Sequence, residues 1–288
     1  MIISSWNIGS LFEKSDTPEF VMEKFLSVLS KSNSDILCLQ EFPVDCSLDG
    51  ESLERKIETA GSFTQHIVFS CSDNHIVTGK KMGLAVFTKY SRLSIIEKHK
   101  LPNPEIQKSI AGTLEKTHDK YFVLTEYNDM HKKKFLVVNG HGFPFHRYGI
   151  DSGSMCPQKC AFDLQKYAYI FTDLDNWIKK ITEEYSEYNI LICADLNIGC
   201  ALKLMPFTFS KYADVFYGEP TRPSGRKTDV VFLPKSLCIQ ARQNMTVSKD
   251  DRDTIKTISA PNSEKRFFDH HLLSCTFSID KKKTEGEL

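Results

Sequence analysis

Short apolar runs alternate with turn residues along most of the chain, and they predict a protein rich in β-strands. One uninterrupted apolar run, Ile-Leu-Ile-Cys-Ala at residues 190–194, stops at Asp195. A short run without polar residues is typical of a strand that is buried on both faces. Similar runs predict strands over 2–7 and 35–41, with a helix between them that begins at Thr17-Pro18. This succession indicates an α/β unit.

The middle of the chain predicts a meander of mostly antiparallel strands. After a short helix over 51–59, strand-like segments separated by turn residues occupy 63–70, 83–88, 93–99, 109–114, 121–127 and 133–141. From 155 to 185 the apolar residues recur with helical spacing, at positions 160, 164, 167, 168, 171, 174, 178 and 181. We therefore expect a long amphipathic helix before the strand that ends at Asp195.

The last third of the chain predicts more strands, over 228–233, 237–247 and 272–279, with a polar stretch over 248–264. No internal repeat or linker divides the sequence, so we expect one domain over 1–280 and a charged, disordered tail over 281–288. The simplest arrangement is an α/β fold of two mixed, mostly antiparallel sheets with helices outside. Such a fold is a four-layer αββα sandwich.

The composition is that of an ordinary globular chain, with 41% hydrophobic and 26% charged residues. Lys and Arg total 37 and Asp and Glu total 37, so no global positive field draws the protein to nucleic acid, although a local patch remains open. No run reaches membrane-spanning length, and the start of the chain does not read as a signal peptide. The nine cysteines indicate reduced thiols. We expect a cytoplasmic protein without a membrane span, and no obligate protein partner is evident.

Acidic, amide and imidazole side chains recur where the predicted strands begin or end. Asp195 and Asn197 follow the central strand, and residues i and i+2 of an extended chain point to the same side. The other members of this set are Asn7, Glu41, His141, Asp229, Asp269 and His270. Each of them alone is also typical of a turn or a strand end. Their recurrence at so many strand ends favours a functional site.

In their order along the chain, these motifs resemble the endonuclease/exonuclease/phosphatase superfamily, the DNase-I-like metal-dependent phosphoesterases. The matching pieces are Ser5-Trp6-Asn7, Leu39-Gln40-Glu41, Gly83-Leu84-Ala85-Val86-Phe87, Asn139-Gly140-His141, Ala194-Asp195-Leu196-Asn197, Thr228-Asp229-Val230-Val231-Phe232 and Phe268-Asp269-His270. They extend over nearly the whole chain, and the fold of the family is the four-layer sandwich expected above. Where the sequence departs from the family pattern, as at Ala194 and Phe268, no charged group is lost.

The resemblance implies hydrolysis of a phosphate ester by in-line attack of water, without a covalent intermediate. It implies that Glu41 binds Mg²⁺ (or Mn²⁺), with Asn7 and Asp269 close by, because hard cations prefer oxygen ligands. It further implies that Asp195 orients and deprotonates the attacking water, while Asn197 holds a phosphoryl oxygen.

A carboxylate–histidine pair, Asp229 and His270, is also implied by the resemblance. The carboxylate would orient the ring and favour its charged form. His270 and His141 would then stabilise the transition state and assist the leaving oxygen. Family register favours His270 over its neighbour His271, which is expected to point the other way.

Two loops carry candidate substrate contacts. His146 and Arg147 lie in an aromatic-rich stretch, and Arg222 and Arg226 lie in a basic stretch just before Asp229. Arginine suits phosphate, and aromatic rings suit stacking on a base. A packed loop and a solvated turn explain the same stretches nearly as well.

Three interpretations of function remain. The first is a phosphodiesterase, either a nuclease or a DNA-end-processing enzyme, whose phosphoester substrate is DNA or RNA. The second is a phosphomonoesterase that acts on inositol-type or other small polyphosphates. The third is a non-catalytic binding module with the same fold. Because every chemically important residue of the motifs is intact, the third interpretation is the least favoured.

Overall fold

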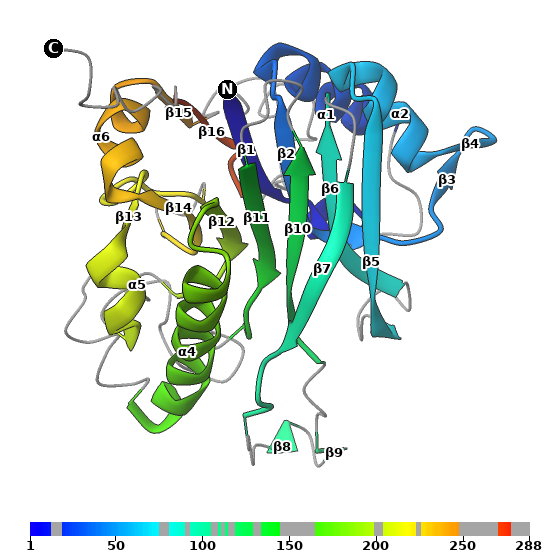
Figure 1. The fold of residues 1–288 in the computed structure, drawn as a ribbon. Coiled ribbons are helices and arrows are strands. Elements are labelled where there is room, and N and C mark those ends of the chain that lie inside the picture. Colours follow the sequence, from blue (N-terminus) through cyan, green and yellow to red (C-terminus); the bar gives the residue numbers. More distant parts are fainter. Residues whose placement is uncertain are drawn as a thin grey trace, which may run out of the picture.

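The computed structural model describes residues 1–12, 19–74, 81–89, 93–104, 109–110, 113–114, 119–128, 134–144, 165–198, 204–222, 226–247 and 270–277. The predicted helix start at Thr17-Pro18, the polar stretch over 248–264 and the tail over 281–288 lie outside these residues. Two six-stranded sheets form the centre of the protein (Figure 1).

The first sheet has the strand order β15-β16-β1-β2-β6-β5. Its members are β15 (Met245–Val247), β16 (Leu273–Thr276), β1 (Ile2–Asn7), β2 (Ile36–Pro43), β6 (Lys81–Thr88) and β5 (Gln65–Asn74). Strands β1 and β2 are parallel, and η1 (Gly9–Phe12) and α1 (Glu19–Ser32) lie between them in the chain. The predicted α/β unit is therefore confirmed. The other pairs in this sheet are antiparallel.

The second sheet has the strand order β13-β14-β12-β11-β10-β7. Its members are β13 (Tyr212–Asp214), β14 (Asp229–Pro234), β12 (Asn189–Asp195), β11 (Lys134–His141), β10 (Tyr121–Asn128) and β7 (Leu93–Lys100). Only β11 and β12 are parallel among these pairs. The predicted meander is thus divided between the sheets, because β5 and β6 belong to the first and β7, β10 and β11 to the second.

Three hydrophobic clusters fill the spaces between the layers. Leu37 and Leu39 of β2 face outward and share a cluster with Phe25 of α1, whereas Cys38, between them, faces the other sheet. Cys193 of β12 belongs to the same cluster between the sheets. A third cluster packs the outer face of the second sheet against α4 (Ala168–Glu184). The expected four-layer αββα sandwich is confirmed.

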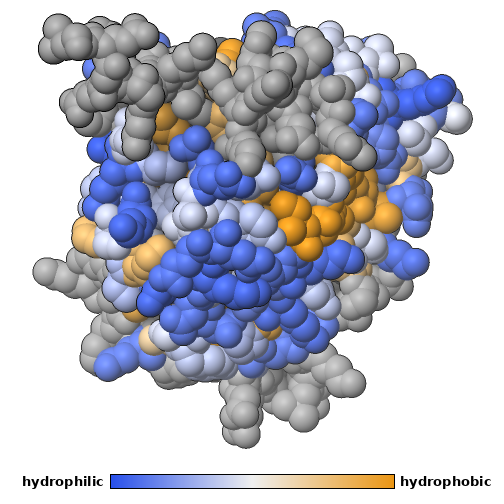
Figure 2. Space-filling view, viewed as in Figure 1, coloured by the Kyte–Doolittle hydropathy of each residue, from blue (hydrophilic) through white to orange (hydrophobic). Residues whose placement is uncertain are grey.

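The helices follow the predicted apolar spacing. The α4 helix buries Ile170, Phe171, Leu174, Trp177, Ile178 and Ile181, and η3 (Gln165–Tyr167) precedes it. The predicted part of this helix before residue 165 lies outside the described residues. Opposite its buried stripe α4 is polar, and Figure 2 shows a mainly hydrophilic face over this region. The short helix α2 (Leu53–Gly61) begins at Ser52, whose side chain accepts a hydrogen bond from the Arg55 amide.

Three local predictions need correction or addition. The segment 237–247 is not one strand, because α6 (Lys235–Gln243) precedes β15 and buries Cys238 and Ala241 at helical spacing. The segment 109–114 holds two short paired strands, β8 (Ser109–Ile110) and β9 (Thr113–Leu114). The hairpin of β3 (Ser47–Leu48) and β4 (Glu51–Ser52) and the helix α5 (Pro206–Lys211) were not predicted.

No helix within the described residues is both long and apolar enough to cross a membrane.

Candidate active site

Three residues of the second sheet lie side by side because of the register of their strands. His141 ends β11 and pairs with Asp195, which ends the parallel strand β12. On the other side of β12, Asp229 begins the antiparallel strand β14 and also pairs with Asp195. The apolar run before Asp195 is fully buried, and it carries the carboxylate to the end of the sheet, where its side chain is 0% exposed. The sheet therefore presents an imidazole and two carboxylates at one edge.

The first sheet supplies the opposite wall of the site. Asn7 ends β1, and its Nδ2 donates a hydrogen bond of 2.8 Å to Asp195 Oδ2. His270 comes just before β16, and its carbonyl oxygen accepts a hydrogen bond of 3.1 Å from Trp6 Nε1. Since β1 and β16 are neighbours in the first sheet, the site lies where the ends of both sheets meet.

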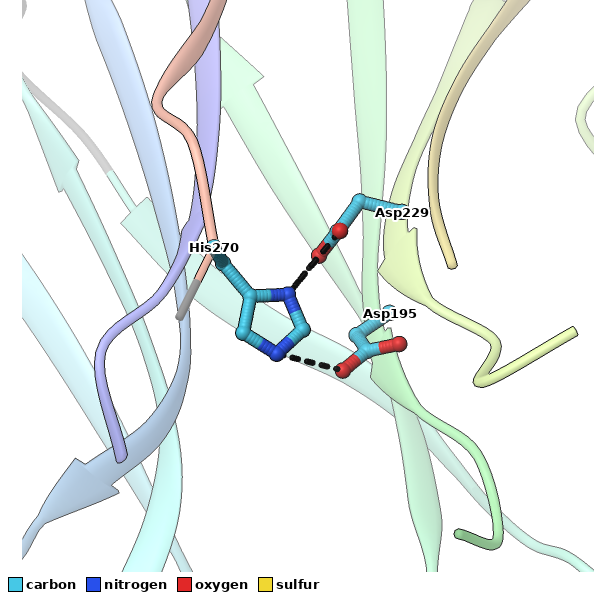
Figure 3. Close-up of side chains that lie close together, drawn as sticks. All are labelled: Asp195, Asp229 and His270. Atoms are coloured by element: carbon cyan, nitrogen blue, oxygen red, sulfur yellow. Dashed lines mark hydrogen bonds and ion pairs between the residues drawn. The ribbon is translucent and has the colours of Figure 1, made fainter. Parts of the chain in front are cut away.

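The predicted carboxylate–histidine pair is present. His270 Nδ1 lies 2.9 Å from each oxygen of Asp229, and His270 Nε2 lies 3.6 Å from Asp195 Oδ2. Figure 3 shows the ring between the two carboxylates, with one nitrogen directed toward each. The hydroxyl groups of Thr221 and Thr228 also donate to Asp229 Oδ2, at 2.7 and 3.0 Å. Asp229 is thus held on several sides, and it fixes the orientation of the His270 ring.

Arg222 lies on the other nitrogen of His270. Its Nη2 is 2.5 Å from His270 Nε2 and 4.0 Å from Asp195 Oδ2, while its Nε donates to Thr228 Oγ1 at 3.0 Å. A guanidinium has only donors, so His270 Nε2 faces a donor, while Nδ1 faces the carboxylate acceptor of Asp229. From the sequence we expect Asp229 to favour a charged His270, and this stays a prediction. Arg222 lies on the other side of the ring and acts against that charge.

The two buried carboxylates have pKa values that are displaced in opposite directions. Burial raises the pKa of Asp195 above its ordinary value, and the negative charge of Asp229 acts in the same direction. Burial also acts to raise the pKa of Asp229, but the His270 ring and the Arg222 guanidinium outweigh it and hold that pKa below the ordinary value. Asp195 is therefore the better proton acceptor of the two.

His141 has a second set of polar neighbours. Its Nε2 is 3.1 Å from Asn197 Nδ2, 3.3 Å from Glu41 Oε1 and 3.8 Å from Asp195 Oδ2. Its Nδ1 is 3.1 Å from Lys120 Nζ. The sequence reasoning missed Lys120, because nothing in its immediate sequence marks a site. Lys120 precedes β10 by one residue, and β10 pairs with β11, the strand that ends at His141. Only this pairing could have indicated that Lys120 lies near the site.

Asn197 reaches the site by a different route from the one predicted. The expectation was an extended chain that points Asp195 and Asn197 to one side. Instead Asn197 has a left-handed backbone with φ 54°, and its amide nitrogen donates to Asp195 Oδ1 at 2.8 Å. The chain therefore turns immediately after β12. The Asn197 side chain still lies beside His141, where it also donates to the Gly142 carbonyl oxygen at 3.3 Å.

Glu41 lies at an irregularity of β2 that turns its side chain toward the site. The pairing of β2 with β6 shifts between Gln40 and Phe42, and Glu41 itself has φ 51°. Its carboxylate packs against Gly9, where a Cβ atom would come within 1.8 Å of Glu41 Oε2. Bulges and positive φ values are frequent at functional sites, and here they place a partly exposed carboxylate next to His141.

Glu41 offers a partly exposed carboxylate, and Asn7 offers an amide oxygen that accepts from the Gly9 amide at 3.0 Å; oxygen ligands of these kinds fit a hard divalent cation. Within the described residues, the group of three potential metal ligands whose atoms lie within 4.8 Å of one another comprises Asp195, Asp229 and His270, not Glu41. Both oxygens of Asp229 already accept hydrogen bonds from His270, which makes that group poorly suited to an ion.

Of the remaining residues predicted for the site, the structure describes some and leaves others outside the described part of the chain. Asp269, His146 and Arg147 lie outside the described residues. Arg226 is exposed, and its carbonyl oxygen accepts from the amides of Thr221 and Arg222, at 3.0 Å in each case. The structure thus places Arg222 in the site and Arg226 on the surface beside it.

Lys227, the third cation of the basic stretch, is buried away from solvent. It pairs with the buried Asp214 at 2.7 Å and donates to the Asp229 carbonyl oxygen at 3.0 Å. These contacts hold Lys227 against the start of β14, so this lysine does not contribute to a cationic surface.

A family model described as the Endonuclease/Exonuclease/phosphatase family matches residues 4–226. The chain belongs to this family. This confirms the resemblance of the sequence motifs. Membership of this family indicates a hydrolase that acts on phosphate esters. A search of curated proteins finds no significant match.

Solved structures of low sequence identity share the fold of this endonuclease/exonuclease/phosphatase family member. The human Nocturnin catalytic domain with bound sulfate is 15% identical, with a TM-score of 0.56 over 96% of this chain and 94% of that one. D. rerio TDP2 in complex with a single-strand DNA product is 15% identical, with a TM-score of 0.56 over 97% and 99%. Truncated Caenorhabditis elegans TDP2 is 12% identical, with a TM-score of 0.60 over 96% and 97%.

Proposed function

We propose that this protein is a divalent-metal-dependent phosphodiesterase that hydrolyses nucleic acid, as a nuclease or a DNA-end-processing enzyme. The observation that carries the proposal is the position of Asp195. This fully buried carboxylate lies between the Nε2 atoms of two imidazoles, 3.8 Å from that of His141 and 3.6 Å from that of His270. A base flanked by two groups that can contact phosphoryl oxygens suits attack of water on a phosphate ester.

Asp195 is the proposed general base. A carboxylate whose pKa is raised by burial takes a proton from water more readily than an ordinary one. Hydrogen bonds from Asn7 Nδ2 and the Asn197 amide nitrogen fix its two oxygens. The carboxylate is therefore oriented before substrate binds, and orientation of this kind lowers the barrier of the chemical step.

His141, Asn197 and His270 are proposed to contact the phosphoryl group. All three present nitrogen atoms close to Asp195 or to its immediate neighbours. Preformed hydrogen-bond donors stabilise negative charge that develops in a transition state, and they do so most strongly in a buried site. Arg222 Nη2 donates to His270 Nε2. A phosphoryl oxygen at this position would take over that hydrogen bond and bring the guanidinium onto the phosphate.

Glu41 and Asn7 are the residues that would hold Mg²⁺ or Mn²⁺, together with Asp269, which lies outside the described residues. When bound, the ion supplies Lewis-acid stabilisation of the charge on the phosphoryl oxygens. The Asn7 side chain also bonds directly to Asp195. Cation binding and the orientation of the base are therefore proposed to depend on one another.

A nucleic-acid substrate is supported by two observations. Arg222 brings a cation to within 4.0 Å of Asp195 Oδ2, beside the proposed position of the phosphate, and the similar D. rerio TDP2 was solved with a single-strand DNA product. The exposed Arg226 and the stretch with His146 and Arg147 are proposed as further contacts along the strand. Phosphate contacts of this type give binding without sequence preference.

The test is hydrolysis of a small panel with Mg²⁺ or Mn²⁺, using the wild type beside Asp195→Asn. The panel holds single-stranded DNA, double-stranded DNA, RNA, a 5′-phosphotyrosyl oligonucleotide and inositol polyphosphates. We expect cleavage of a nucleic-acid substrate, with loss of at least about 100-fold in the variant. Release of phosphate from inositol polyphosphates alone would replace the proposal with a phosphomonoesterase. Absence of turnover on the whole panel with either metal would contradict it and favour a binding module.

A further inference from the structure

We propose that Thr221 is a positioning residue that fixes the carboxylate of Asp229 against the ring of His270. Thr221 is 0% exposed, and its Oγ1 donates a hydrogen bond of 2.7 Å to Asp229 Oδ2. The sequence motifs of the site do not contain Thr221. The inference deepens the proposed function and rests on it for the catalytic consequence, whereas the link between Thr221 and Asp229 can be tested without any substrate.

The neighbours of the Thr221 hydroxyl group decide the direction of its hydrogen bonds. A hydroxyl group has one proton to donate and two lone pairs that can accept. The backbone amides of Thr228 and Asp229 both donate to Thr221 Oγ1, at 3.0 and 3.1 Å. Both lone pairs are then engaged, and the Asp229 carboxylate takes the proton. One hydroxyl group therefore holds the backbone and the side chain of Asp229 together.

The backbone of Thr221 reaches the segment that carries His270. The Thr221 carbonyl oxygen accepts a hydrogen bond of 2.8 Å from the amide of His271, the next residue after His270. Asp229 begins β14 of the second sheet, whereas His270 and His271 come before β16 of the first sheet. The Thr221 amide in turn donates to the Arg226 carbonyl oxygen at 3.0 Å. Thr221 thus joins the two segments, one from each sheet, that supply the carboxylate–histidine pair.

Thr228 also donates to Asp229 Oδ2, at 3.0 Å, but it does not provide the same link. Its Oγ1 accepts from Arg222 Nε at 3.0 Å, and its backbone is continuous with that of Asp229. A displacement of the start of β14 would therefore carry Thr228 along with the carboxylate. Thr221 lies eight residues earlier in the chain and holds Asp229 from a separate segment.

A displaced Asp229 would turn the ring of His270. Both Asp229 oxygens lie 2.9 Å from His270 Nδ1, and the opposite ring nitrogen, Nε2, lies 3.6 Å from Asp195 Oδ2. Figure 3 shows the ring between these two carboxylates. A rotation at Nδ1 moves Nε2 away from the proposed position of the phosphoryl group. Misplacement of a catalytic group by about 1 Å can lower a rate by about 100-fold.

A purely structural role is the competing explanation, and kcat separates the two. Thr221→Val removes the hydroxyl group and keeps a side chain of similar shape, whereas Thr221→Ser keeps the hydroxyl group. We expect Thr221→Val to lower kcat about 10- to 100-fold with KM changed less than about twofold, because the misplaced ring acts in the transition state. Thr221→Ser should restore kcat to within about threefold of the wild type.

Thr208 on α5, outside the site, provides a matched control. It is also 0% exposed, and its Oγ1 donates to the buried Asp175 Oδ1 at 2.7 Å. Thr208→Val therefore deletes the same kind of hydrogen bond to a buried carboxylate. Both valine variants should lower the urea concentration at which half of the protein is unfolded. Only Thr221→Val should lower kcat, which is measured on the folded protein without urea.

The decisive experiment is a double-mutant cycle of Thr221→Val with Asp229→Ala. If Thr221 acts through Asp229, the double variant should have the kcat of Asp229→Ala to within about twofold. The same cycle is followed by urea unfolding, without metal or substrate. There the shift of the unfolding midpoint that Thr221→Val causes should be smaller when Asp229 is already replaced by Ala, since one of the lost hydrogen bonds is then absent.

Three kinetic results would overturn the proposal: an unchanged kcat in Thr221→Val, a loss of kcat that Thr221→Ser does not restore, and losses that multiply in the double variant. A raised KM at constant kcat would overturn it as well. If Thr221→Val does not fold, Thr221→Ala is read in the same way. If the wild type hydrolyses no substrate, the proposed function alone fails. The urea cycle still decides the link to Asp229, and additive midpoint shifts would refute it.

Discussion

Asn7 Nδ2 donates a hydrogen bond of 2.8 Å to Asp195 Oδ2, and this bond joins the two sheets at the centre of the site. Asn7 ends β1 of the first sheet and Asp195 ends β12 of the second. Both residues are buried, at 3% and 0% exposure, so water does not replace the bond if it is lost. The geometry of the proposed base therefore depends on the packing of one sheet against the other.

Replacement of Asn7 by Ala should destabilise the protein and impair catalysis together. Asp195 Oδ2 would lose a donor in a buried position, which costs about 1–3 kcal/mol in the free energy of unfolding. Urea unfolding measures this cost. Asn176, which is exposed on α4, provides the matched control, and Asn176→Ala should change the free energy by less than about 0.5 kcal/mol. If both substitutions changed the free energy of unfolding equally, the hydrogen bond between Asn7 and Asp195 would not contribute to stability.

Asp195 and Asp229 should couple stability to pH with opposite signs in the metal-free protein. The folded-state pKa of Asp195 is raised, so between the ordinary value of about 3.9 and that raised value the folded chain binds more protons than the unfolded chain. Stability then falls as pH rises. Thermal melts should therefore show that the wild type loses stability relative to Asp195→Asn as the pH rises from the ordinary to the raised pKa of Asp195.

For Asp229 the sign is reversed, because its folded-state pKa is lowered. Its contribution is complete above the ordinary value of about 3.9 and is lost as pH falls through the folded-state pKa. The wild type should therefore lose stability relative to Asp229→Asn on acidification below about pH 4. If the wild type lost stability in the same direction of pH relative to both Asp195→Asn and Asp229→Asn, the opposite pKa shifts assigned to the two carboxylates would be wrong.

The sequence predicts the parts of this site that depend on strand ends. The apolar run before Asp195 identifies β12, and the register of β11 and β14 with β12 brings His141 and Asp229 to the same level. Pairing partners are not written in a single sequence. The resemblance to a family grouped these residues into one site without naming the pairings, and the structure provides the physical reason.

What the sequence did not predict depends on side-chain packing. Arg222, Arg226 and Lys227 are equivalent cations in the sequence, yet one lies in the site, one on the surface and one in a buried ion pair. Lys120 is brought to His141 by a ladder between β10 and β11. The apolar residues of α6 fit the spacing of a strand as well as that of a helix, because the run is short, and only packing in three dimensions decides between the two.

Arg222→Ala should raise KM for a nucleic-acid substrate about tenfold at low salt, because a partly buried guanidinium next to the phosphate position is lost. Arg226 remains a predicted contact. Since it is exposed, Arg226→Ala should have a smaller effect that disappears as salt is raised. Arg55→Ala, on the exposed face of α2, is the control for loss of a charge. Steady-state kinetics across a salt series test all three, and an unchanged KM for Arg222→Ala would remove this residue from the substrate site.

Gly9 and Glu41 offer a test of the proposed cation site that keeps every charge in place. A Cβ atom at residue 9 would lie 1.8 Å from Glu41 Oε2, so Gly9→Ala must displace the carboxylate. We expect Mg²⁺ to stabilise the wild type in thermal melts, by about 2.7 kcal/mol at a concentration of 100 Kd, and a chelator to abolish activity. Gly9→Ala should raise the Kd for Mg²⁺ about tenfold or more, as displacement of a ligand does, and Glu41→Gln should raise it further.

Glu23→Gln, an exposed substitution on α1, controls for the loss of one carboxylate and should leave the Mg²⁺ titration unchanged. If Gly9→Ala bound Mg²⁺ as tightly as the wild type while Glu41→Gln did not, Glu41 would hold the ion from a position that the Cβ atom does not reach. If neither variant altered the titration, the ion would have to bind elsewhere. The group formed by Asp195, Asp229 and His270 would then be the alternative, and Asp229→Asn should abolish the stabilisation by Mg²⁺.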